Sequence, residues 1–165
     1  MSLRNLPKSA LTMNEREWLR DRAAALPGDA IIVHIGVDLG ASLLCSRAGN
    51  PEAAIIGIDL DPGKFQGEQD EMMALVKADS ATYYMDGEIH FLFVDGDHSE
   101  QAVTADIENY TPALVPGGIV AFHDYGWSHL RWCAGVKAAV DAWDWTGWKQ
   151  VDAPDSIRAY ERIGE

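Results

Sequence analysis

The chain has 165 residues and carries 26 acidic against 13 basic side chains, a formal net charge of -13. This negative charge would repel phosphate backbones, so nucleic acid is not an expected partner. Hydrophobic residues make up 47%, and no apolar run approaches the roughly 18 residues that cross a membrane. We predict a single domain over residues 1–165, with a helical segment at 1–28 and the core at 29–165.

The cysteines and the first residues bear on the cellular compartment. Cys45 and Cys133 lie far apart and outside any CxxC pattern, so we expect neither a disulfide framework nor a thiolate zinc site. The opening MSLRNL shows no apolar segment followed by a small-residue cleavage site, so no secretory signal is expected. The predicted location is the cytoplasm.

Hydrophobic periodicity predicts alternating helices and strands through the first half of the chain. The predicted elements are an amphipathic helix over 14–26 with Asn14 as its cap, a buried strand over 30–35, a turn at 36–40, a helix over 41–48, and strands over 53–58 and 72–77. Pro27 and Gly28 end the first helix. The strands are short and rich in β-branched residues, as expected for strands buried on both faces.

The second half continues the alternation and ends in a hairpin. We predict a strand over 89–94, a helix over 99–114, a strand over 119–122 introduced by two glycines, a helix over 135–143, and an antiparallel hairpin over 148–151 and 157–162. Strands that alternate with helices indicate right-handed crossovers. The predicted fold is therefore α/β and Rossmann-like, with a mostly parallel sheet and a C-terminal antiparallel hairpin.

Polar or glycine-rich residues follow every predicted parallel strand. They are His34 with the 36–40 turn, Asp59, Asp79 with Ser80, the run 95–98, and His123 with Asp124. In open α/β sheets ligands bind outside the carboxyl ends of the strands. Scattered surface charge would not gather at these five places, so we predict the functional site there.

The turn GVDLG contains Gly36, Asp38 and Gly40, and its glycines allow the backbone to approach a ligand closely. Glycine turns of this kind also occur for steric reasons alone. Asp59 follows about 20 residues later, where a carboxylate can accept hydrogen bonds from both hydroxyls of a ribose. Asp59 and Asp61 also suit a simple turn before Pro62, and the two roles are compatible.

The motifs FVDGDHS at 93–99 and PGGIVAFHDY at 116–125 are the densest polar signals in the chain. With them, the sequence resembles the class I S-adenosylmethionine-dependent methyltransferases, of the metal-dependent O-methyltransferase-like branch with DGDH after strand four and PGG…HD after strand five. The resemblance covers residues 30–162. It implies S-adenosylmethionine as cofactor and transfer of its methyl group to an oxygen of a small molecule.

The resemblance implies roles for individual residues. The implied cofactor-binding set is His34, Gly36, Asp38, Gly40, Asp59, Asp79, Ser80 and Asp95. The glycines would line the methionine portion, Asp59 would hold the ribose, and Asp79 with Ser80 would lie beside the adenine. His34 stands where the family usually has an acid. The interval between Asp59 and Asp95 leaves little room for the usual helix after strand two, so we expect part of the adenine wall to be missing.

In metal-dependent relatives, acids after strands four and five hold a divalent cation, which maps onto Asp95, His123 and Asp124. Oxygen ligands suit Mg²⁺ or Mn²⁺, and an imidazole shifts the preference towards Mn²⁺, Fe²⁺ or Zn²⁺. His123 as a hydrogen-bonding group and Asp124 as a helix cap are the alternatives. We predict Asp97 or His98 as the catalytic group that accepts the proton, with a capping role as the alternative for His98.

Three other functions fit parts of the sequence. A metal-dependent hydrolase would use the DGDH and HD pairs but would leave the glycine turn and Asp59 unexplained. A nicotinamide-dependent oxidoreductase is disfavoured because GxGxxG is absent. A non-catalytic binding protein is favoured by His34, by the short segment before Asp95, and by an N-terminal helix too small for a full substrate lid.

Tryptophans gather in the last part of the chain, at positions 127, 132, 143, 145 and 148. We expect most of them to pack in the core or in an interface, with an aromatic wall for a flat acceptor as the alternative. Any that stay exposed would favour a homodimer, since a second subunit can complete the site of a small enzyme without a lid.

Overall fold

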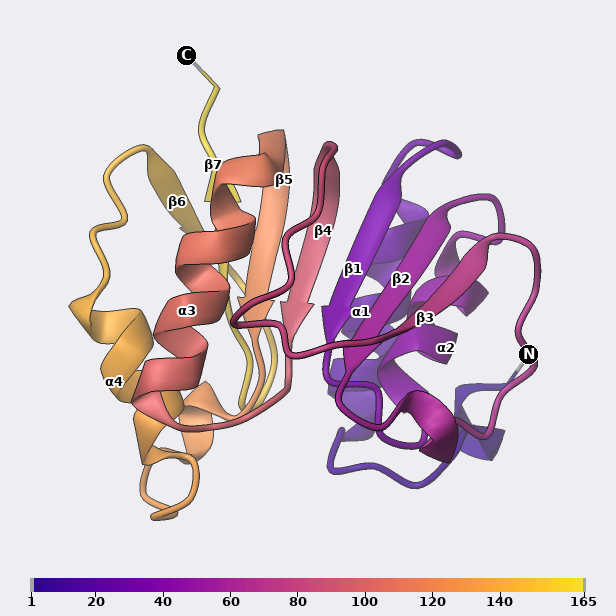
Figure 1. The fold of residues 1–165 in the computed structure, drawn as a ribbon, viewed down its shortest axis with the longest axis horizontal. Helices are drawn as coiled ribbons and strands as arrows, with labels where there is room; N and C mark the ends of the chain where they lie inside the picture. Colours follow the sequence, from indigo (N-terminus) through magenta and orange to yellow (C-terminus); the bar gives the residue numbers. More distant parts are fainter. Residues whose placement is uncertain (1, 165) are drawn as a thin grey trace.

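The computed structural model describes residues 2–164, in which seven strands form a sheet between two layers of helices (Figure 1). The strands are β1 (Ile31–Ile35), β2 (Ala54–Asp59), β3 (Met73–Lys77), β4 (Ile89–Val94), β5 (Leu114–Phe122), β6 (Trp148–Val151) and β7 (Arg158–Arg162). Their order is β3-β2-β1-β4-β5-β7-β6. Neighbours from β3 to β5 pair in parallel, and β7 pairs antiparallel with β5 and β6. The predicted fold is confirmed.

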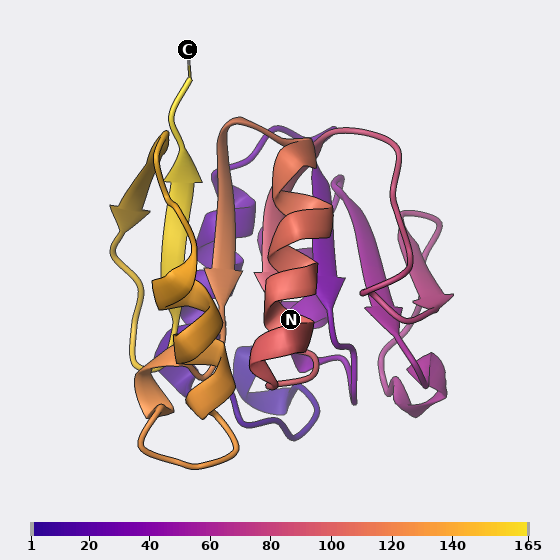
Figure 2. The same cartoon turned by 60° about the vertical axis from the view of Figure 1, so that its left-hand side comes forward.

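Two helices cover each face of the sheet. They are α1 (Met13–Ala24) and α2 (Ala41–Gly49) on one face, and α3 (Glu100–Tyr110) and α4 (Ala134–Ala142) on the other (Figure 2). Short 3₁₀ turns lie at Leu3–Asn5, Pro62–Lys64, Thr111–Ala113 and Tyr125–Trp127. Within the described residues, no helix combines the length and the apolar character needed to span a membrane.

The central strand β4 shows why these apolar runs form a buried sheet. Phe91 and Phe93 pack into the core beneath α1 and α2, whereas Leu92 and Val94 pack into the core beneath α3. Successive side chains of a strand point to opposite faces, so a strand covered on both faces needs apolar side chains towards each of them. All four side chains are at most 3% exposed.

The N-terminal helix begins earlier than its periodicity suggests. Thr12, and not Asn14, is the N-cap: its hydroxyl accepts a hydrogen bond from Glu15 N, and the Glu15 side chain accepts one from Thr12 N. This reciprocal capping box satisfies two amides that the first turn would otherwise leave unpaired. It also draws Glu15 into the interior, where it is 0% exposed.

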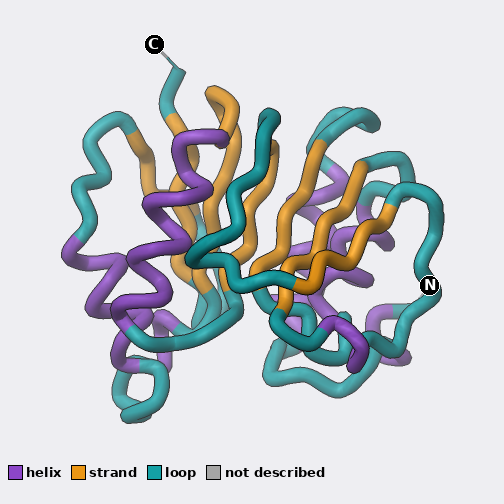
Figure 3. The backbone as a smooth tube through the Cα atoms, viewed as in Figure 1, coloured by secondary structure: helices purple, strands orange, loops and turns teal. Residues whose placement is uncertain are grey.

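Two connections differ from the predicted lengths. The helix predicted over 99–114 ends at Tyr110 in a 3₁₀ turn, because Pro112 cannot continue the helical hydrogen bonds, and Leu114 already belongs to β5. The expected lack of a helix between β2 and β3 is confirmed, since only the Pro62–Lys64 turn lies there. Residues 78–88 likewise join β3 to β4 as a loop without a helix (Figure 3).

Most of the tryptophans pack as expected. Trp145 stacks on Tyr160 with ring centroids 4.0 Å apart, and Trp143, Trp145 and Trp148 lie against the core beneath α3 and α4. Trp132 is different, because it is 57% exposed.

Candidate active site

A pocket of about 590 Å³ lies at the carboxyl ends of β1 to β4, and α3 forms one of its sides. Its size is within the range of small-molecule sites. Six of the eight residues expected to bind the cofactor line it, namely Gly36, Asp38, Asp59, Asp79, Ser80 and Asp95. The structure therefore brings most of that set together at one edge of the sheet.

The turn after β1 requires glycine at both ends. Gly36 has a φ of +87°, and a Cβ there would lie 2.1 Å from the carbonyl oxygen of Asp95. Gly40 has a φ of +93°, and a Cβ there would lie 2.3 Å from the Phe65 ring. The steric explanation for these glycines therefore holds, and the same close packing brings the turn against the end of β4.

Asp59 organises the same turn from the end of β2. Its Oδ2 accepts hydrogen bonds from Val37 N at 2.7 Å and Asp38 N at 3.2 Å, and its Oδ1 accepts one from Asp61 N at 2.7 Å. Burial opposes ionisation, but these backbone hydrogen bonds outweigh it and lower the pKa of Asp59. An ionised carboxylate therefore stands on the wall of the pocket at neutral pH.

His34 does not line this pocket, contrary to the expectation from its position near the end of β1. It is 0% exposed, its Nε2 lies 3.0 Å from Ser46 Oγ, and its ring packs against Phe93. Burial lowers the pKa of His34 to about 3, so the imidazole is neutral. His34 belongs to the core beneath α2.

A second pocket of about 210 Å³ adjoins the first and shares Gly36, Asp38 and Asp95 with it. Residues 8–11, which precede α1, form part of its wall, and Gly40 lines it rather than the larger pocket. The wall also contains polar and aromatic side chains, those of His98, Asp124 and Trp132.

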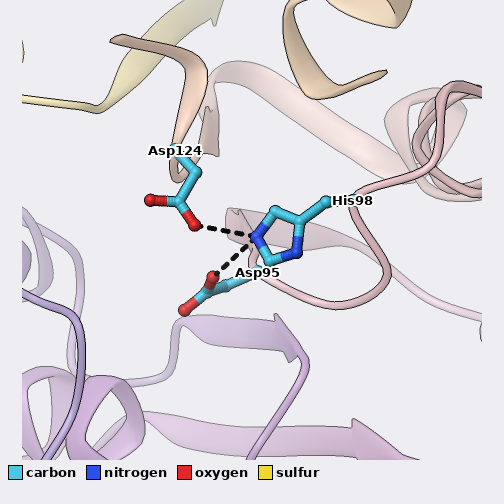
Figure 4. A group of neighbouring side chains, drawn as sticks. All are labelled: Asp95, His98 and Asp124. Atoms are coloured by element: carbon cyan, nitrogen blue, oxygen red, sulfur yellow. Dashed lines mark ion pairs between the residues drawn. The ribbon is translucent and has the colours of Figure 1, made fainter. Parts of the chain in front are cut away.

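Asp95, His98 and Asp124 converge beside this second pocket (Figure 4). His98 Nε2 lies 2.8 Å from Asp124 Oδ2 and 3.9 Å from Asp95 Oδ1, and one ligand atom from each residue lies within 4.8 Å of the others. The ion pair with Asp124 raises the pKa of His98. Asp124 sits in a left-handed turn with a φ of 63°, which directs its carboxylate towards His98.

His123 lies behind this group, with both ring nitrogens engaged. Its Nδ1 is 3.0 Å from Asp95 Oδ1, its Nε2 is 3.3 Å from Glu15 Oε2, and it is 1% exposed. Burial disfavours the charged ring, but hydrogen bonds to Asp124, Asp95 and Glu15 outweigh it and raise the pKa of His123 to about 12. His123 Nδ1 also lies 3.4 Å from Asp124 Oδ1, so both imidazoles contact both aspartates, His98 at the pocket wall and His123 as a buried cation behind it.

Glu15 is the functional residue that sequence reasoning missed. Its Oε1 accepts hydrogen bonds from Ser156 N at 3.0 Å and Ser156 Oγ at 2.6 Å, and its Oε2 faces His123. Burial opposes its ionisation, but the hydrogen bonds from His123 and Ser156 lower the pKa of Glu15. The pattern Thr-x-x-Glu at 12–15 was the available signal, since it places a glutamate at the start of a helix.

The two residues predicted to be catalytic lie in different surroundings. Asp97 is exposed, and its Oδ1 accepts a hydrogen bond from Ser99 N at 2.7 Å, which lowers the pKa of Asp97. Ser99 in turn caps α3 through Ala102 N. Asp97 therefore supports the loop before α3, whereas His98 contacts both aspartates of the cluster.

Comparison with known protein families identifies the chain. A family described as "Methyltransferase domain" matches residues 33–125, which is more than half of the sequence. The chain belongs to this methyltransferase family. This membership, together with the fold, makes it an S-adenosylmethionine-dependent methyltransferase and sets aside the hydrolase and the oxidoreductase considered above. No curated protein sequence matches the chain.

Solved structures share the fold at low sequence identity. The O-methyltransferase NovP is 17% identical with a TM-score of 0.73, and the alignment covers 98% of this chain and 86% of NovP. A putative caffeoyl-CoA O-methyltransferase from Staphylococcus aureus is 13% identical with a TM-score of 0.69, covering 98% and 88%. The N-methyltransferase NodS from Bradyrhizobium japonicum WM9, solved with S-adenosyl-L-homocysteine, is 14% identical with a TM-score of 0.62, covering 89% and 85%.

Proposed function

We propose that this methyltransferase transfers the methyl group of S-adenosylmethionine to a hydroxyl oxygen of a small molecule. The observation that carries the proposal is the meeting of the two pockets at Gly36, Asp38 and Asp95, with His98 and Asp124 on the wall of the smaller one. The larger pocket would hold the cofactor, and the smaller one would hold the acceptor beside a group that can remove its proton.

The larger pocket offers the groups that the parts of the cofactor need. Asp59 is ionised and faces the middle of the pocket, where it can accept hydrogen bonds from ribose hydroxyls. Asp38 and Asp95 lie towards the second pocket and suit the positively charged amino group of the methionine portion. Asp79 and Ser80 lie at the other end, where adenine would bind.

His98 is the better candidate for accepting the acceptor's proton. It lines the acceptor pocket and is held by Asp124, whereas Asp97 is exposed and its carboxylate is occupied by Ser99 N. In the proposed reaction the bond from the methyl carbon to sulfur breaks and its electrons stay on sulfur. A new carbon–oxygen bond forms, and the hydroxyl proton passes to His98 in its neutral form, with Asp124 stabilising the imidazolium that results.

The residues present also fit a divalent cation. Neither His98 Nε2 nor Asp124 Oδ1, both buried, has a hydrogen bond of good geometry within residues 2–164. Two carboxylates and one imidazole suit Mn²⁺, and also Mg²⁺ completed by water. Asp95, His98 and Asp124 would hold the ion, and His123 would fix the orientation of Asp95. When bound, such an ion would lower the pKa of an acceptor hydroxyl.

Trp132 lies at the edge of the acceptor pocket. Its ring meets His98 edge-on at 5.7 Å, and 57% of its surface is exposed. This exposure supports either contact with a flat acceptor or coverage by a second copy of the chain, and the homodimer stays a prediction. Sedimentation of wild type and Trp132→Ala decides between these roles, because only a dimer contact changes the mass in solution.

A transfer assay tests the proposed function. Methyl-labelled S-adenosylmethionine is incubated with the protein and a panel of small phenols, catechols and sugars, with and without Mg²⁺ or Mn²⁺. We expect label in an O-methylated product, and its loss in Asp124→Asn and His98→Ala. His129→Ala, which removes an exposed histidine outside both pockets, is the matched control. Transfer that persists in both site variants would contradict the proposal.

A further inference from the structure

The segment that precedes α1 is fixed in place although only the turn at Leu3–Asn5 is regular structure. Arg16 of α1 is 8% exposed, and its Nη1 donates a hydrogen bond to the carbonyl oxygen of Leu3 at 2.9 Å. Its Nη2 donates to the carbonyl oxygen of Pro7 and to Ser9 Oγ, each at 3.0 Å. A buried guanidinium needs such bonds to offset the loss of water. Arg16 therefore sets the path of the segment.

Buried leucines hold the same segment on both sides of an exposed stretch. Leu6 and Leu11 belong to the core beneath α1 and α2. Residues 8–10 lie between them and are exposed, yet they line the smaller pocket. This stretch therefore forms an exposed part of the pocket wall, and its buried neighbours fix its position.

Lys8 brings a positive charge to this wall. Among the side chains described as lining the smaller pocket, it is the only lysine or arginine. It lies between Pro7 and Ser9, which bind the same nitrogen of Arg16, so the backbone is held on both sides of it. Within residues 2–164 its ammonium group forms no ion pair.

The acids of the same pocket already have partners. Asp95 and Asp124 contact the two imidazoles described above, and Asp38 is assigned to the amino group of the cofactor. In the described part of the chain, the charge of Lys8 has no such counterpart. A negatively charged group on the acceptor would complement it.

Exposure distinguishes the inner part of this pocket from its mouth. Asp124 is 2% exposed, whereas Lys8 and Ser9 are exposed to water. Ser9 Oγ accepts its hydrogen bond from Arg16, which leaves its own O–H available as a donor. The pocket therefore suits a molecule with a hydroxyl at its inner end and an anionic group at the mouth.

Deepening the proposed function, on which this inference rests, we propose that Lys8 pairs with an anionic group of the methyl acceptor, a carboxylate or a phosphate. The hydroxyl that receives the methyl group meets His98. Arg16 is a positioning residue for this contact, because it holds the residues on both sides of Lys8. The pairing lies away from the reacting oxygen, so it should act on KM for the acceptor and leave kcat unchanged.

Two matched pairs of acceptors test the proposal in the transfer assay. They are 3,4-dihydroxybenzoate with its methyl ester, and glucose 6-phosphate with glucose, so the pairs distinguish a carboxylate from a phosphate. We expect kcat/KM to be about 3- to 10-fold higher for the anionic member of one pair, as for a partly exposed ion pair. The preference should shrink as salt is added, because salt screens exposed charges.

Variants assign the preference to Lys8. Lys8→Gln should raise KM for the anionic compound by the same factor, with kcat and the Kd for S-adenosylhomocysteine unchanged, and Lys8→Arg should restore the wild-type KM. Lys149→Gln, which removes an exposed lysine outside both pockets, is the matched control. Arg16→Lys keeps a charge but loses the planar fork, so it should raise KM for both members of the pair without changing kcat.

The outcomes separate this inference from the proposed function. Equal kcat/KM within both pairs, or a preference that survives Lys8→Gln, would overturn the role of Lys8 and leave the cofactor site intact. A wild type that binds S-adenosylhomocysteine but methylates neither anionic compound would also overturn it. A wild type that neither binds S-adenosylhomocysteine nor transfers a methyl group would overturn the proposed function as well. The wild-type comparison needs no variant, so it does not depend on how Arg16→Lys folds.

Discussion

Two buried carboxylates, one beside each pocket, lie in opposite electrostatic surroundings. Asp124, 2% exposed, lies between His98 and His123, and despite its burial these imidazoles lower its pKa. Asp106, 1% exposed, has no cation near it, and burial raises its pKa to about 6. Two imidazoles balance the charge of Asp124, whereas no cation within residues 2–164 balances that of Asp106.

This difference indicates that the two parts of the site have different roles. Three carboxylates and two histidines at the acceptor end hold one another in fixed positions, as chemistry that depends on alignment requires. Asp106, beside the larger pocket, is buried without a cation among the described residues, which costs stability when its carboxyl group ionises. We therefore expect substitutions beside the two pockets to change different measured properties, catalysis in one case and stability in the other.

The largest effect is expected at the acceptor end, on catalysis. His98→Ala should lower kcat/KM for methyl transfer by about 10²- to 10⁴-fold, because it removes the proposed proton acceptor. The Kd for S-adenosylhomocysteine should stay unchanged, because His98 does not line the larger pocket. Steady-state kinetics and calorimetry measure the two quantities, and a parallel loss of cofactor affinity would show that His98 acts on binding instead.

The next largest effect is expected on stability, at the buried ion pair of Glu15 and His123. Glu15→Gln should lower the free energy of unfolding by about 3 to 5 kcal/mol, because it removes a charge from a buried ion pair and leaves His123 undercompensated. Urea denaturation checks this. Glu17→Gln, an exposed acid on the same helix, is the control and should be close to wild type. Equal midpoints for the two variants would mean that His123 is held without Glu15.

Asp106, whose pKa is raised, should destabilise the fold when it ionises. The pKa of Asp106 is about 6 in the folded chain, above its ordinary value of 3.8, so the unfolded state releases this proton first and stability falls as pH rises between these values. The loss amounts to roughly 2 to 3 kcal/mol. Asp106→Asn should remove this dependence and be more stable than wild type at pH 8. Denaturation at pH 4 and pH 8 measures it, and a variant less stable at pH 8 would contradict the difference between the two ends.

The smallest effect is expected on stability, at the hydrogen bond between Ser46 and His34 in the core beneath α2. Ser46→Ala removes the hydrogen-bond partner of His34 Nε2 and should cost about 1 to 2 kcal/mol of stability, the penalty of one unsatisfied buried polar group. Affinity for S-adenosylhomocysteine should not change, because His34 faces the core. Reduced affinity in a folded Ser46→Ala protein would return His34 to the cofactor site.

The sequence predicted the sheet well because its strands carry their own signal. The run 89–94 is apolar except for His90 and is observed as β4 with the same bounds, and Asp59 was expected at the end of β2, where it lies. Residues that follow parallel strands necessarily meet at one edge of the sheet. The gathering of most of the expected cofactor-binding residues around one pocket follows from that topology.

The arrangement of His98 and His123 around Asp95 and Asp124 was beyond the sequence. It depends on the left-handed turn at Asp124 and on Glu15, which contacts His123 across 108 positions of the chain. Asp106 was missed for a similar reason, because an acid within a helix is normally assigned to the solvent side. Only the packing of α3 on the sheet shows that this one is buried beside the pocket.

The most direct test of the account is a calorimetric titration of S-adenosylhomocysteine into the wild type and into Asp59→Ala, with and without Mg²⁺ or Mn²⁺. We expect micromolar binding by the wild type and its loss in the variant, because Asp59 both faces the ribose and holds the glycine turn. Absence of binding by the wild type under all of these conditions would contradict the assignment of the larger pocket to the cofactor.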